Sequence, residues 1–346
     1  MIIVLKPGIS KQEESAVLAE IRRLGYRPHV MRGVARTVIG AIGDERTHHT
    51  LETLTALPQV ESVMPIQKRF KLVSREAHPA NSTITLPNGC IIGGKELVVM
   101  AGPCSVESEK QLMTTAKAVA KAGARVLRGG AFKPRTSPYE FQGLGEKGLK
   151  LLAKARKETG LAVITELLSE DHAELVAEHA DMLQIGTRNA QNFQLLIAAA
   201  KTGKPVLLKR GLAMKIEEWL LAGEYVLSNN NPGLLFCERG IRTFETYTRN
   251  TLDLSTIPII KQESHCPIVI DPSQGAGRAD LVVAMCKGAV AMGADALLIE
   301  VHPNPAEAWS DGAQQLTLEG FAKLMRDLQP FAAAAGREPC ASTKKR

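Results

Sequence analysis

The sequence is poor in aromatic residues, and it lacks apolar runs long enough to cross a membrane. Aromatic residues make up 4% of the 346 residues, whereas 45% are hydrophobic. A core built from Ala, Val, Ile and Leu is therefore expected, as in α/β barrels, and fibrous or disordered classes are excluded. Because no apolar run approaches the roughly 20 residues of a membrane span, a membrane partner is not expected.

The sequence also lacks internal runs of basic residues and closely spaced cysteines. The net charge is +7, and the only basic run is Lys344, Lys345 and Arg346 at the C-terminus, so we expect no nucleic-acid partner. The six cysteines are far apart, and no signal peptide precedes them. This pattern predicts reduced thiols and a cytoplasmic location.

The N-terminal part of the chain predicts a domain of its own. Its apolar segments indicate the order strand, helix, strand, strand, helix, strand, which is the ferredoxin-like βαββαβ arrangement. We place this domain at residues 1–72, a linker and hairpin at 73–96, a barrel at 97–336 and a flexible tail at 337–346. The pair Asn88-Gly89 is typical of a hairpin turn, and the hairpin is expected to plug the bottom of the barrel.

From Leu97 onward, short apolar segments alternate with amphipathic helical segments. This alternation predicts parallel strands joined by helices, and eight such units indicate an α/β fold of the (β/α)8 TIM-barrel type. A doubly wound open sheet is the alternative fold. A last helix over residues 318–333 would complete the barrel.

Charged side chains follow most of the predicted strands, where a barrel carries its active site. The cations are Arg128, Lys133, Arg135, Arg188, Lys209, Arg210 and Arg239, and the acids are Glu166, Glu238, Asp271 and Glu300. Clustered like charges cost several kcal/mol in a partly dry site unless an anion lies among them. Arg and Lys bind phosphate and carboxylate groups, so phosphorylated substrates are predicted. The alternative is that each cation forms an ordinary ion pair with one of the acids.

Cys104, Glu300 and Asp311 are candidate ligands for one divalent metal ion. Their mixture of sulfur and oxygen donors suits Mn, Fe, Co or Zn more than Mg. No HExxH or CxxC motif is present, so a structural role for Cys104 as a small buried side chain stays open. His302 would face the same side of its strand as Glu300, either beside the site or as a capping residue.

Several motifs in order closely resemble the 3-deoxy-D-arabino-heptulosonate 7-phosphate (DAHP) synthase family, in the branch with an N-terminal ferredoxin-like domain. The motifs are Ala101-Gly102-Pro103-Cys104-Ser105, Lys133-Pro134-Arg135-Thr136-Ser137, Gly186-Thr187-Arg188-Asn189-Ala190, Leu208-Lys209-Arg210-Gly211, Cys237-Glu238-Arg239-Gly240 and Glu300-Val301-His302-Pro303. The Lys133 to Ser137 motif resembles an erythrose 4-phosphate motif, which disfavours a related synthase of the eight-carbon sugar acid.

The resemblance implies a transferase of the shikimate pathway that condenses phosphoenolpyruvate with erythrose 4-phosphate. It implies that phosphoenolpyruvate is held by Arg128, Lys133, Arg188, Lys209 and Arg239, with Glu238 in the same substrate-binding set. Arg135 and Thr136 would hold the aldose phosphate, and Lys133, Cys104 and Glu300 would be the catalytic set.

One position departs from the family pattern. The family pattern is Asp-Pro-Ser-His, in which the His is a metal ligand, whereas this chain has Asp271-Pro272-Ser273-Gln274. An amide oxygen is a poorer ligand than imidazole for a late transition metal. Three accounts of Gln274 are open. The enzyme keeps the reaction with weaker or different metal binding, it uses another aldehyde or imine acceptor, or it is a weakly catalytic regulatory protein.

The N-terminal domain suggests feedback control. An aromatic amino acid or prephenate would bind between copies of the domain and block the mouth of the barrel, and the resemblance implies a homotetramer or homodimer. The alternative is a passive oligomerisation module, since this fold by itself specifies no function.

Overall fold

The computed structural model describes residues 1–33, 36–43, 45–64, 69–135 and 137–338, with only the backbone of residues 45–50. The chain divides into two compact units. The first comprises Met1–Asn81 with Gln262–His265, and the second comprises Ser82–Lys261 with the chain from Cys266 onward. Residues 73–81, which the sequence places in the linker, thus belong to the first unit.

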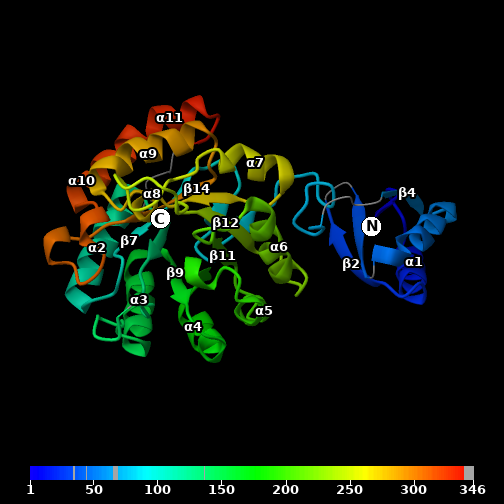
Figure 1. Cartoon of the computed structure of the whole chain (residues 1–346), viewed down its shortest axis with the longest axis horizontal. Helices are drawn as coiled ribbons and strands as arrows, with labels where there is room; N and C mark the ends of the chain where they lie inside the picture. The colour runs from blue at the N-terminus through cyan, green and yellow to red at the C-terminus, as the bar shows by residue number, and fades with distance from the viewer. Residues whose placement is uncertain (34–35, 44, 65–68, 136, 339–346) are drawn as a thin grey trace. The chain divides into compact units, whose positions relative to one another are not determined.

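The first unit has the predicted order of elements (Figure 1). The elements are β1 (Ile2–Leu5), α1 (Lys11–Arg23), β2 (Arg27–Arg32), β3 (Thr37–Ile42), the 3₁₀ helix η1 (Glu45–Ala56) and β4 (Val60–Met64). The strands form an antiparallel sheet in the order β2-β3-β1-β4. Ser10 and Glu13 form a capping box at the start of α1, which satisfies backbone N–H groups there. The second helical element is 3₁₀, not the α-helix expected from its periodicity.

Both faces of this sheet are covered by apolar side chains. On one face Ile3 and Ile39 pack with Val17 and Ile21 of α1, and on the other Ile2 and Val4 pack against Ala77. Ala77 explains why the unit extends beyond residue 72, because its segment contributes to the core.

The second unit is a closed parallel barrel, as the sequence predicts. In the described part of the chain the strand order is β7-β8-β9-β10-β11-β12-β13-β14, and β14 pairs with β7. The strands are β7 (Val98–Gly102), β8 (Val126–Arg128), β9 (Ala162–Leu167), β10 (Met182–Ile185), β11 (Val206–Lys209), β12 (Leu234–Glu238), β13 (Ile268–Ile270) and β14 (Ala296–Glu300). The pairing excludes the open sheet, which was the alternative.

Helices surround the barrel (Figure 1). They are α2 (Glu109–Ala122), α3 (Glu146–Thr159), α4 (Ala173–His179), α5 (Phe193–Lys201), α6 (Ile216–Leu227), α7 (Thr256–Glu263), α8 (Pro272–Ala276), α9 (Ala279–Ala291), α10 (Leu318–Asp327) and α11 (Gln329–Ala334). Short 3₁₀ helices are η2 (Glu170–His172), η3 (Thr187–Asn189), η4 (Pro305–Glu307) and η5 (Gly312–Gln314).

The predicted last helix over residues 318–333 is two helices, α10 and α11. Pro330 lies in the first turn of α11, where a missing backbone N–H is tolerated, whereas inside one continuous helix it would break a hydrogen bond. None of the helices in the described part of the chain is long and apolar enough to cross a membrane.

The predicted hairpin fills the N-terminal end of the barrel. It consists of β5 (Ile84–Thr85) and β6 (Ile91–Ile92), which pair antiparallel. Leu86 and Cys90 belong to the same buried cluster as interior side chains of the barrel strands, such as Val126. Asn88 in the turn donates to the carbonyls of Arg125 and Gly160, at 2.9 and 3.2 Å. Since these residues precede β8 and β9, the hairpin plugs the bottom of the barrel, as expected.

Candidate active site

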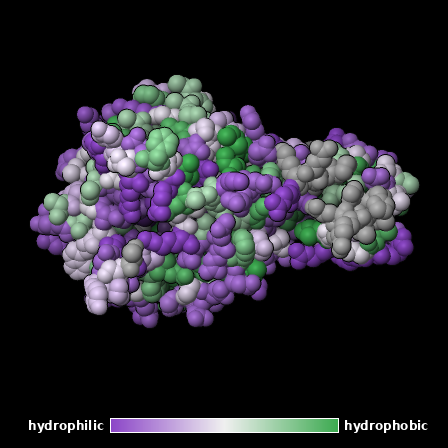
Figure 2. Space-filling model, viewed as in Figure 1, coloured by the Kyte–Doolittle hydropathy of each residue, from purple (hydrophilic) through white to green (hydrophobic). Residues whose placement is uncertain are grey.

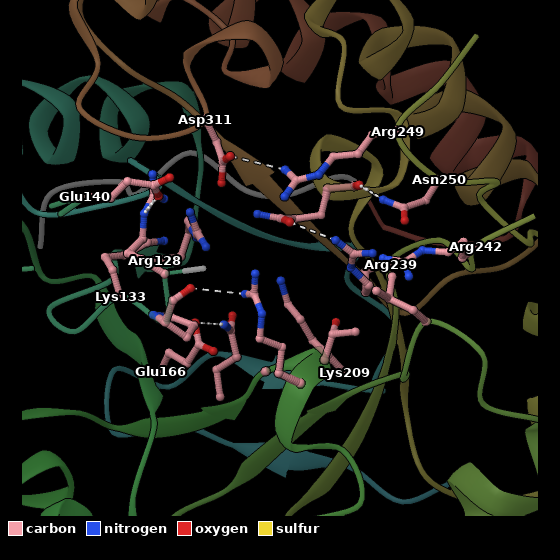
Figure 3. A pocket seen from close by; sticks show the side chains of 18 residues that line it. Arg128, Lys133, Glu140, Glu166, Lys209, Arg239, Arg242, Arg249, Asn250 and Asp311 are labelled. Atoms are coloured by element: carbon pink, nitrogen blue, oxygen red, sulfur yellow. Dashed lines mark hydrogen bonds and ion pairs between the residues drawn. The ribbon is translucent and has the colours of Figure 1, made fainter. Parts of the chain in front are cut away.

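A cavity of about 580 Å³ lies at the C-terminal ends of the strands, and most of the side chains that line it are charged or polar (Figure 3). The lining cations are Arg128, Lys133, Arg135, Arg188, Lys209, Arg239, Arg242 and Arg249. The lining acids, among the described residues, are Glu140, Glu166 and Asp311. Hydrophilic residues also gather over the middle of the barrel on the face drawn in Figure 2. The cavity therefore carries a large excess of positive charge.

The structure brings together six of the seven cations that the sequence places at the strand ends. Arg128 and Lys209 are the last residues of β8 and β11, and Arg239 directly follows β12. In Figure 3 the labelled Arg128, Lys209 and Arg239 converge on one space from different sides. Arg188 belongs to η3 and donates to the Pro134 carbonyl at 3.2 Å. Thr136, which is expected to bind the aldose phosphate together with Arg135, lies outside the described residues.

Ion pairs with the acids are also present, as the alternative interpretation of the charged strand ends predicts. Arg128 Nη1 lies 2.9 Å from Glu300 Oε1, and Lys209 Nζ lies 2.6 Å from Asp271 Oδ2. All four side chains are buried, yet both cations line the cavity. Each pair therefore holds a cation in a place from which it can also contact an anion.

Glu238 does not line the cavity, although the sequence places it with the substrate-binding residues. Its side chain is fully buried, with Arg210 Nη1 3.0 Å from Oε2 and the Gly240 N–H 2.7 Å from Oε1. Burial raises the pKa of Glu238, although Arg210 and the Gly240 N–H oppose the rise. Arg210 also pairs with Asp253 at 2.9 Å, so Glu238 and Arg210 form a structural network beside the cavity.

The three candidate metal ligands come together at one point, and one of them, Asp311, lines the cavity. One donor atom each of Cys104, Glu300 and Asp311 lies within 4.8 Å of the other two. Glu300 ends β14, and Cys104 follows β7 after a turn at Gly102. Gly102 has φ +155°, and a Cβ there would lie 2.1 Å from the Arg128 carbonyl oxygen. Because a side chain at this position would collide with the backbone of β8, glycine is required to place Cys104.

Each candidate ligand has its own cation. Lys133 Nζ lies 3.0 Å from Cys104 Sγ, and Arg249 Nη1 lies 3.2 Å from Asp311 Oδ1. Arg128 is the corresponding partner of Glu300. The three potentially negative ligands are thus balanced by three fixed positive charges.

Burial and charged neighbours together set the protonation of this cluster. It raises the pKa of the Cys104 thiol to about 11, and the nearby Glu300 carboxylate adds to the rise. Burial opposes the charge on Lys133, but Cys104 and Glu166 outweigh it and raise the pKa of the ammonium group. Burial also opposes the charge on Asp311, but the Arg249 guanidinium, the Cys104 thiol and Lys133 together outweigh it and lower the pKa of the carboxyl group. At neutral pH Lys133 is therefore cationic and the Cys104 thiol is protonated.

His302 is a structural residue of the loop that follows β14. Its Nδ1 accepts the Asn304 N–H at 3.1 Å, so Nε2 carries the proton that faces Glu107 Oε2 at 3.2 Å. Glu107 in turn accepts the Trp309 N–H at 2.9 Å. Of the two roles open from the sequence, the structure supports the capping one.

Gln274 lies in α8 at the edge of the cavity. Its side-chain nitrogen donates to Glu300 Oε1 at 3.0 Å, and its side-chain oxygen accepts from Arg239 Nη2 at 2.9 Å. The residue thus joins a candidate metal ligand to a cation of the cavity.

Three further residues belong to the site although no sequence motif marks them: Arg242, Arg249 and Gln314. Both arginines line the cavity, and Gln314 donates to Glu300 Oε2 at 2.7 Å while accepting from Arg249 at 3.1 Å. The arginines lie on the long loop between β12 and α7. Their only sequence signal is that this loop follows a barrel strand, where functional residues gather.

Comparison with known proteins matches both units. The model of the DAHP synthetase I family matches residues 77–333, and that of the DAHP synthase ferredoxin-like domain matches residues 1–68. The chain is 49% identical over 336 residues to phospho-2-dehydro-3-deoxyheptonate aldolase of Thermotoga maritima, covering 97% of this chain and 99% of the relative. It is 31% identical over 268 residues to 2-dehydro-3-deoxyphosphooctonate aldolase of Caulobacter vibrioides, covering 71% and 92%.

Solved structures give the same result. The crystal structure of the Thermotoga maritima DAHP synthase has a TM-score of 0.78 and covers 97% of this chain and 98% of its own. A truncated form of that enzyme has a TM-score of 0.73 and covers 78% of this chain and 98% of its own. Both are 49% identical to this chain. With its cationic barrel mouth and its N-terminal ferredoxin-like domain, the chain belongs to the DAHP synthetase I family.

Proposed function

We propose that the cavity condenses phosphoenolpyruvate with erythrose 4-phosphate, giving DAHP and inorganic phosphate. The observation that carries this proposal is the set of cations from different strand ends that line a single cavity of about 580 Å³. Two phosphate groups and one carboxylate supply the negative charge that such a lining needs. Family membership supports the same reaction, and the product makes this the first step of the shikimate pathway.

We assign the phosphoenolpyruvate site to the more buried cations. Arg128, Lys133, Lys209 and Arg239 are all buried, and Arg188 completes the set at a more exposed position. Charge-assisted hydrogen bonds to phosphate are strong where water is excluded. These residues would therefore bind the triply charged substrate and orient its C3 atom toward the second substrate.

Arg135 is assigned to the phosphate of erythrose 4-phosphate, with Thr136 beside it in the chain. Arg135 Nε lies 2.6 Å from Glu140 Oε2, and this carboxylate is partly exposed. A phosphate could take the place of the carboxylate at the same guanidinium group, because both present oxygen atoms to the planar fork of Arg. Erythrose 4-phosphate would thus enter from the solvent side of the cavity.

Different residues of the cavity contribute to different steps of the proposed reaction. C3 of phosphoenolpyruvate attacks the aldehyde carbon, water adds to C2, and phosphate leaves. Lys133 is protonated and reaches the centre of the site, so we assign its Nζ as the donor of the proton that the aldehyde oxygen gains. Arg128, Lys209 and Arg239 stabilise the negative charge of the phosphate that leaves.

Cys104, Glu300 and Asp311 fit a divalent metal ion. Their donor atoms converge within 4.8 Å, and a mixed set of one thiolate and two carboxylates suits Mn, Fe, Co or Zn. When bound, the metal supplies a Lewis acid for the carbonyl group of the aldehyde.

The reaction is tested by incubating the full chain with phosphoenolpyruvate, erythrose 4-phosphate and each of Mn²⁺, Fe²⁺, Co²⁺ and Zn²⁺ in turn. We expect release of phosphate and one DAHP per phosphate, and no activity for Lys209→Met. Arabinose 5-phosphate is the control acceptor, and turnover with it alone would overturn the assignment in favour of a redirected enzyme. Binding of phosphoenolpyruvate without turnover with any acceptor would instead identify a weakly catalytic regulatory protein.

The N-terminal unit is proposed to bind an aromatic amino acid or prephenate and to inhibit the barrel within a homotetramer or homodimer. Its ferredoxin-like fold and the family model for residues 1–68 support a separate role for this unit. Inhibition by tyrosine, phenylalanine or prephenate in the phosphate-release assay is the expected result. Absence of inhibition by all three would support the passive oligomerisation module.

The location is proposed to be the cytoplasm. In the described part of the chain, Cys90, Cys104, Cys237 and Cys286 are buried and carry free thiols. Reduced thiols are the rule in a reducing compartment.

A further inference from the structure

We infer that Gln274 orients the anion-binding arginines of this enzyme and does not serve as a fourth metal ligand. The inference rests on the proposed function, because it assigns a role within the phosphoenolpyruvate site. It is carried by the two side-chain contacts of Gln274, to Glu300 Oε1 at 3.0 Å and to Arg239 Nη2 at 2.9 Å.

The chemistry of these two neighbours fixes which end of the amide faces which partner. A guanidinium group offers only donors, and an ionised carboxylate offers only acceptors. The amide oxygen must therefore face Arg239, and the amide NH₂ must face Glu300. If the amide were reversed, its NH₂ group would face the donors of Arg239 and its oxygen would face the carboxylate of Glu300. Both hydrogen bonds would then be lost.

The backbone of Gln274 is held as firmly as its side chain. Its N–H donates to Asp271 Oδ1 at 2.9 Å, and its carbonyl accepts from Asn250 Nδ2 at 3.0 Å. Asp271 Oδ2 in turn lies 2.6 Å from Lys209 Nζ. Helix α8, which carries Gln274, is thus connected through Asp271 to Lys209, a second cation that lines the cavity.

Gln274 also shares an acceptor with a third cation. Glu300 Oε1 accepts both from Gln274 and from Arg128 Nη1, the latter at 2.9 Å. A chain of contacts therefore runs from Arg239 through the amide and the carboxylate to Arg128. A guanidinium group that is already oriented loses less conformational entropy when it binds an anion, so this chain favours substrate binding.

A metal could use the oxygen of Gln274 only after that oxygen left Arg239. The amide would then turn its oxygen toward Glu300, where the NH₂ group now donates. Amide oxygens are also weaker ligands than imidazole for late transition metals. The geometry thus leaves Cys104, Glu300 and Asp311 as the protein ligands and gives the amide to the anion site.

Binding to the full-length protein separates the two roles. Wild type, Gln274→Met and the control Gln194→Met are stripped of metal with a chelator and titrated calorimetrically with phosphoenolpyruvate, and in separate experiments with Mn²⁺. Methionine keeps the length of the side chain but removes both hydrogen bonds. Gln194 is exposed on α5, so the control makes the same change of side chain on the surface of the barrel.

For Gln274→Met we expect phosphoenolpyruvate to bind about tenfold more weakly in the absence of metal, the loss typical of a hydrogen bond to a charged group. The Mn²⁺ dissociation constant should change by less than about threefold, since Arg128 and Gln314 still hold Glu300. Gln274→Glu should bind phosphoenolpyruvate more weakly still, because its carboxylate neutralises Arg239 and repels Glu300.

Two outcomes would overturn the inference. One is unchanged affinity of Gln274→Met for phosphoenolpyruvate, and the other is a loss of Mn²⁺ affinity of tenfold or more. Failure of wild type to bind phosphoenolpyruvate would instead count against the proposed function itself. Circular dichroism and thermal unfolding of each variant establish that the protein titrated is folded.

Discussion

At the N-terminal end of the strands the barrel is filled by the hairpin β5–β6, whereas at the C-terminal end it opens into a cavity lined by cations. The hairpin contributes apolar side chains such as Leu86 and Ile92, both buried in one cluster with the interior of the barrel. At the other end buried cations such as Arg128 and Lys209 are held by acids. One end therefore serves the stability of the fold, and the other is the end that we propose binds the charged substrates.

The two ends also differ in how a substitution should act. An apolar residue of the hairpin stabilises the fold through the area that it buries and the cavity that it fills. A buried ion pair at the open end contributes little net stability, because the cost of desolvation offsets the attraction, but removing one partner leaves the other charge buried and unpaired. Mutations at the bottom should therefore lower stability without affecting binding, whereas mutations at the top should affect catalysis as well as stability.

The largest effect is expected for Arg128→Met at the open end. Its loss removes a cation that stabilises the phosphate in the transition state, so kcat/KM should fall by about 10²- to 10³-fold. Because Glu300 would be left without its 2.9 Å partner, unfolding should also become easier by about 3 kcal/mol. Phosphate release and urea unfolding measure the two effects. Normal kcat/KM with reduced stability would show that Arg128 is structural and that the two ends of the barrel do not differ in this respect.

Leu86→Ala is the matching change at the closed end. Leu86 is 2% exposed and lies in the barrel cluster, so truncation should lower the free energy of unfolding by about 3 kcal/mol. KM for phosphoenolpyruvate should stay within about twofold of the wild-type value. A large rise in KM with little loss of stability would mean that the two ends are coupled. Steady-state kinetics and urea unfolding of the same preparation decide between these results.

The buried cysteines at the two ends should differ in their effect on the pH dependence of metal binding. Burial raises the pKa of both Cys90 and Cys104 to about 11. At a pH below this pKa, a metal ion can bind the sulfur of Cys104 only if the thiol loses its proton. Metal affinity should therefore rise about tenfold per pH unit between pH 6 and 9.

Titration with Zn²⁺ across this pH range measures the slope. Cys90→Ala should leave the slope unchanged, whereas Cys104→Ala should lower the affinity and remove the contribution of the thiol. A slope that persists in Cys104→Ala would show that another group releases the proton.

The smallest effect is expected at the tip of the hairpin. Asn88→Ala removes the hydrogen bonds to the carbonyls of Arg125 and Gly160, and stability should fall by about 1 kcal/mol. Catalytic constants should not change. A thermal unfolding curve identical to that of the wild type would show that the apolar side chains alone fix the hairpin.

Much of this arrangement follows from local sequence patterns. The strands of the barrel were predictable because near-continuous apolar segments of a buried parallel sheet stand out from amphipathic helices. The hairpin was predictable from Asn88-Gly89, whose glycine adopts φ +79°. The short helix α8 was not predicted, although Asp271 followed by Pro272 is a typical start of a helix.

The partners of charged residues could not be read from the sequence. Glu238 is the last residue of β12 and Arg239 directly follows it, yet Glu238 is buried against Arg210 while Arg239 lines the cavity. Side chains of a strand alternate between its two sides, but the register that decides their direction depends on tertiary packing. The contact of Gln274 with Arg239 likewise joins two separate strand ends, so only the folded barrel reveals it.

We propose that the cations at the open end bind the substrate phosphates. A crystal structure of the full chain with phosphoenolpyruvate and Mn²⁺ would show this binding. We predict the phosphate within hydrogen-bonding distance of Lys209 and Arg239 and the metal between Cys104, Glu300 and Asp311. Phosphoenolpyruvate bound elsewhere, with these side chains still engaged only with their acids, would contradict the account.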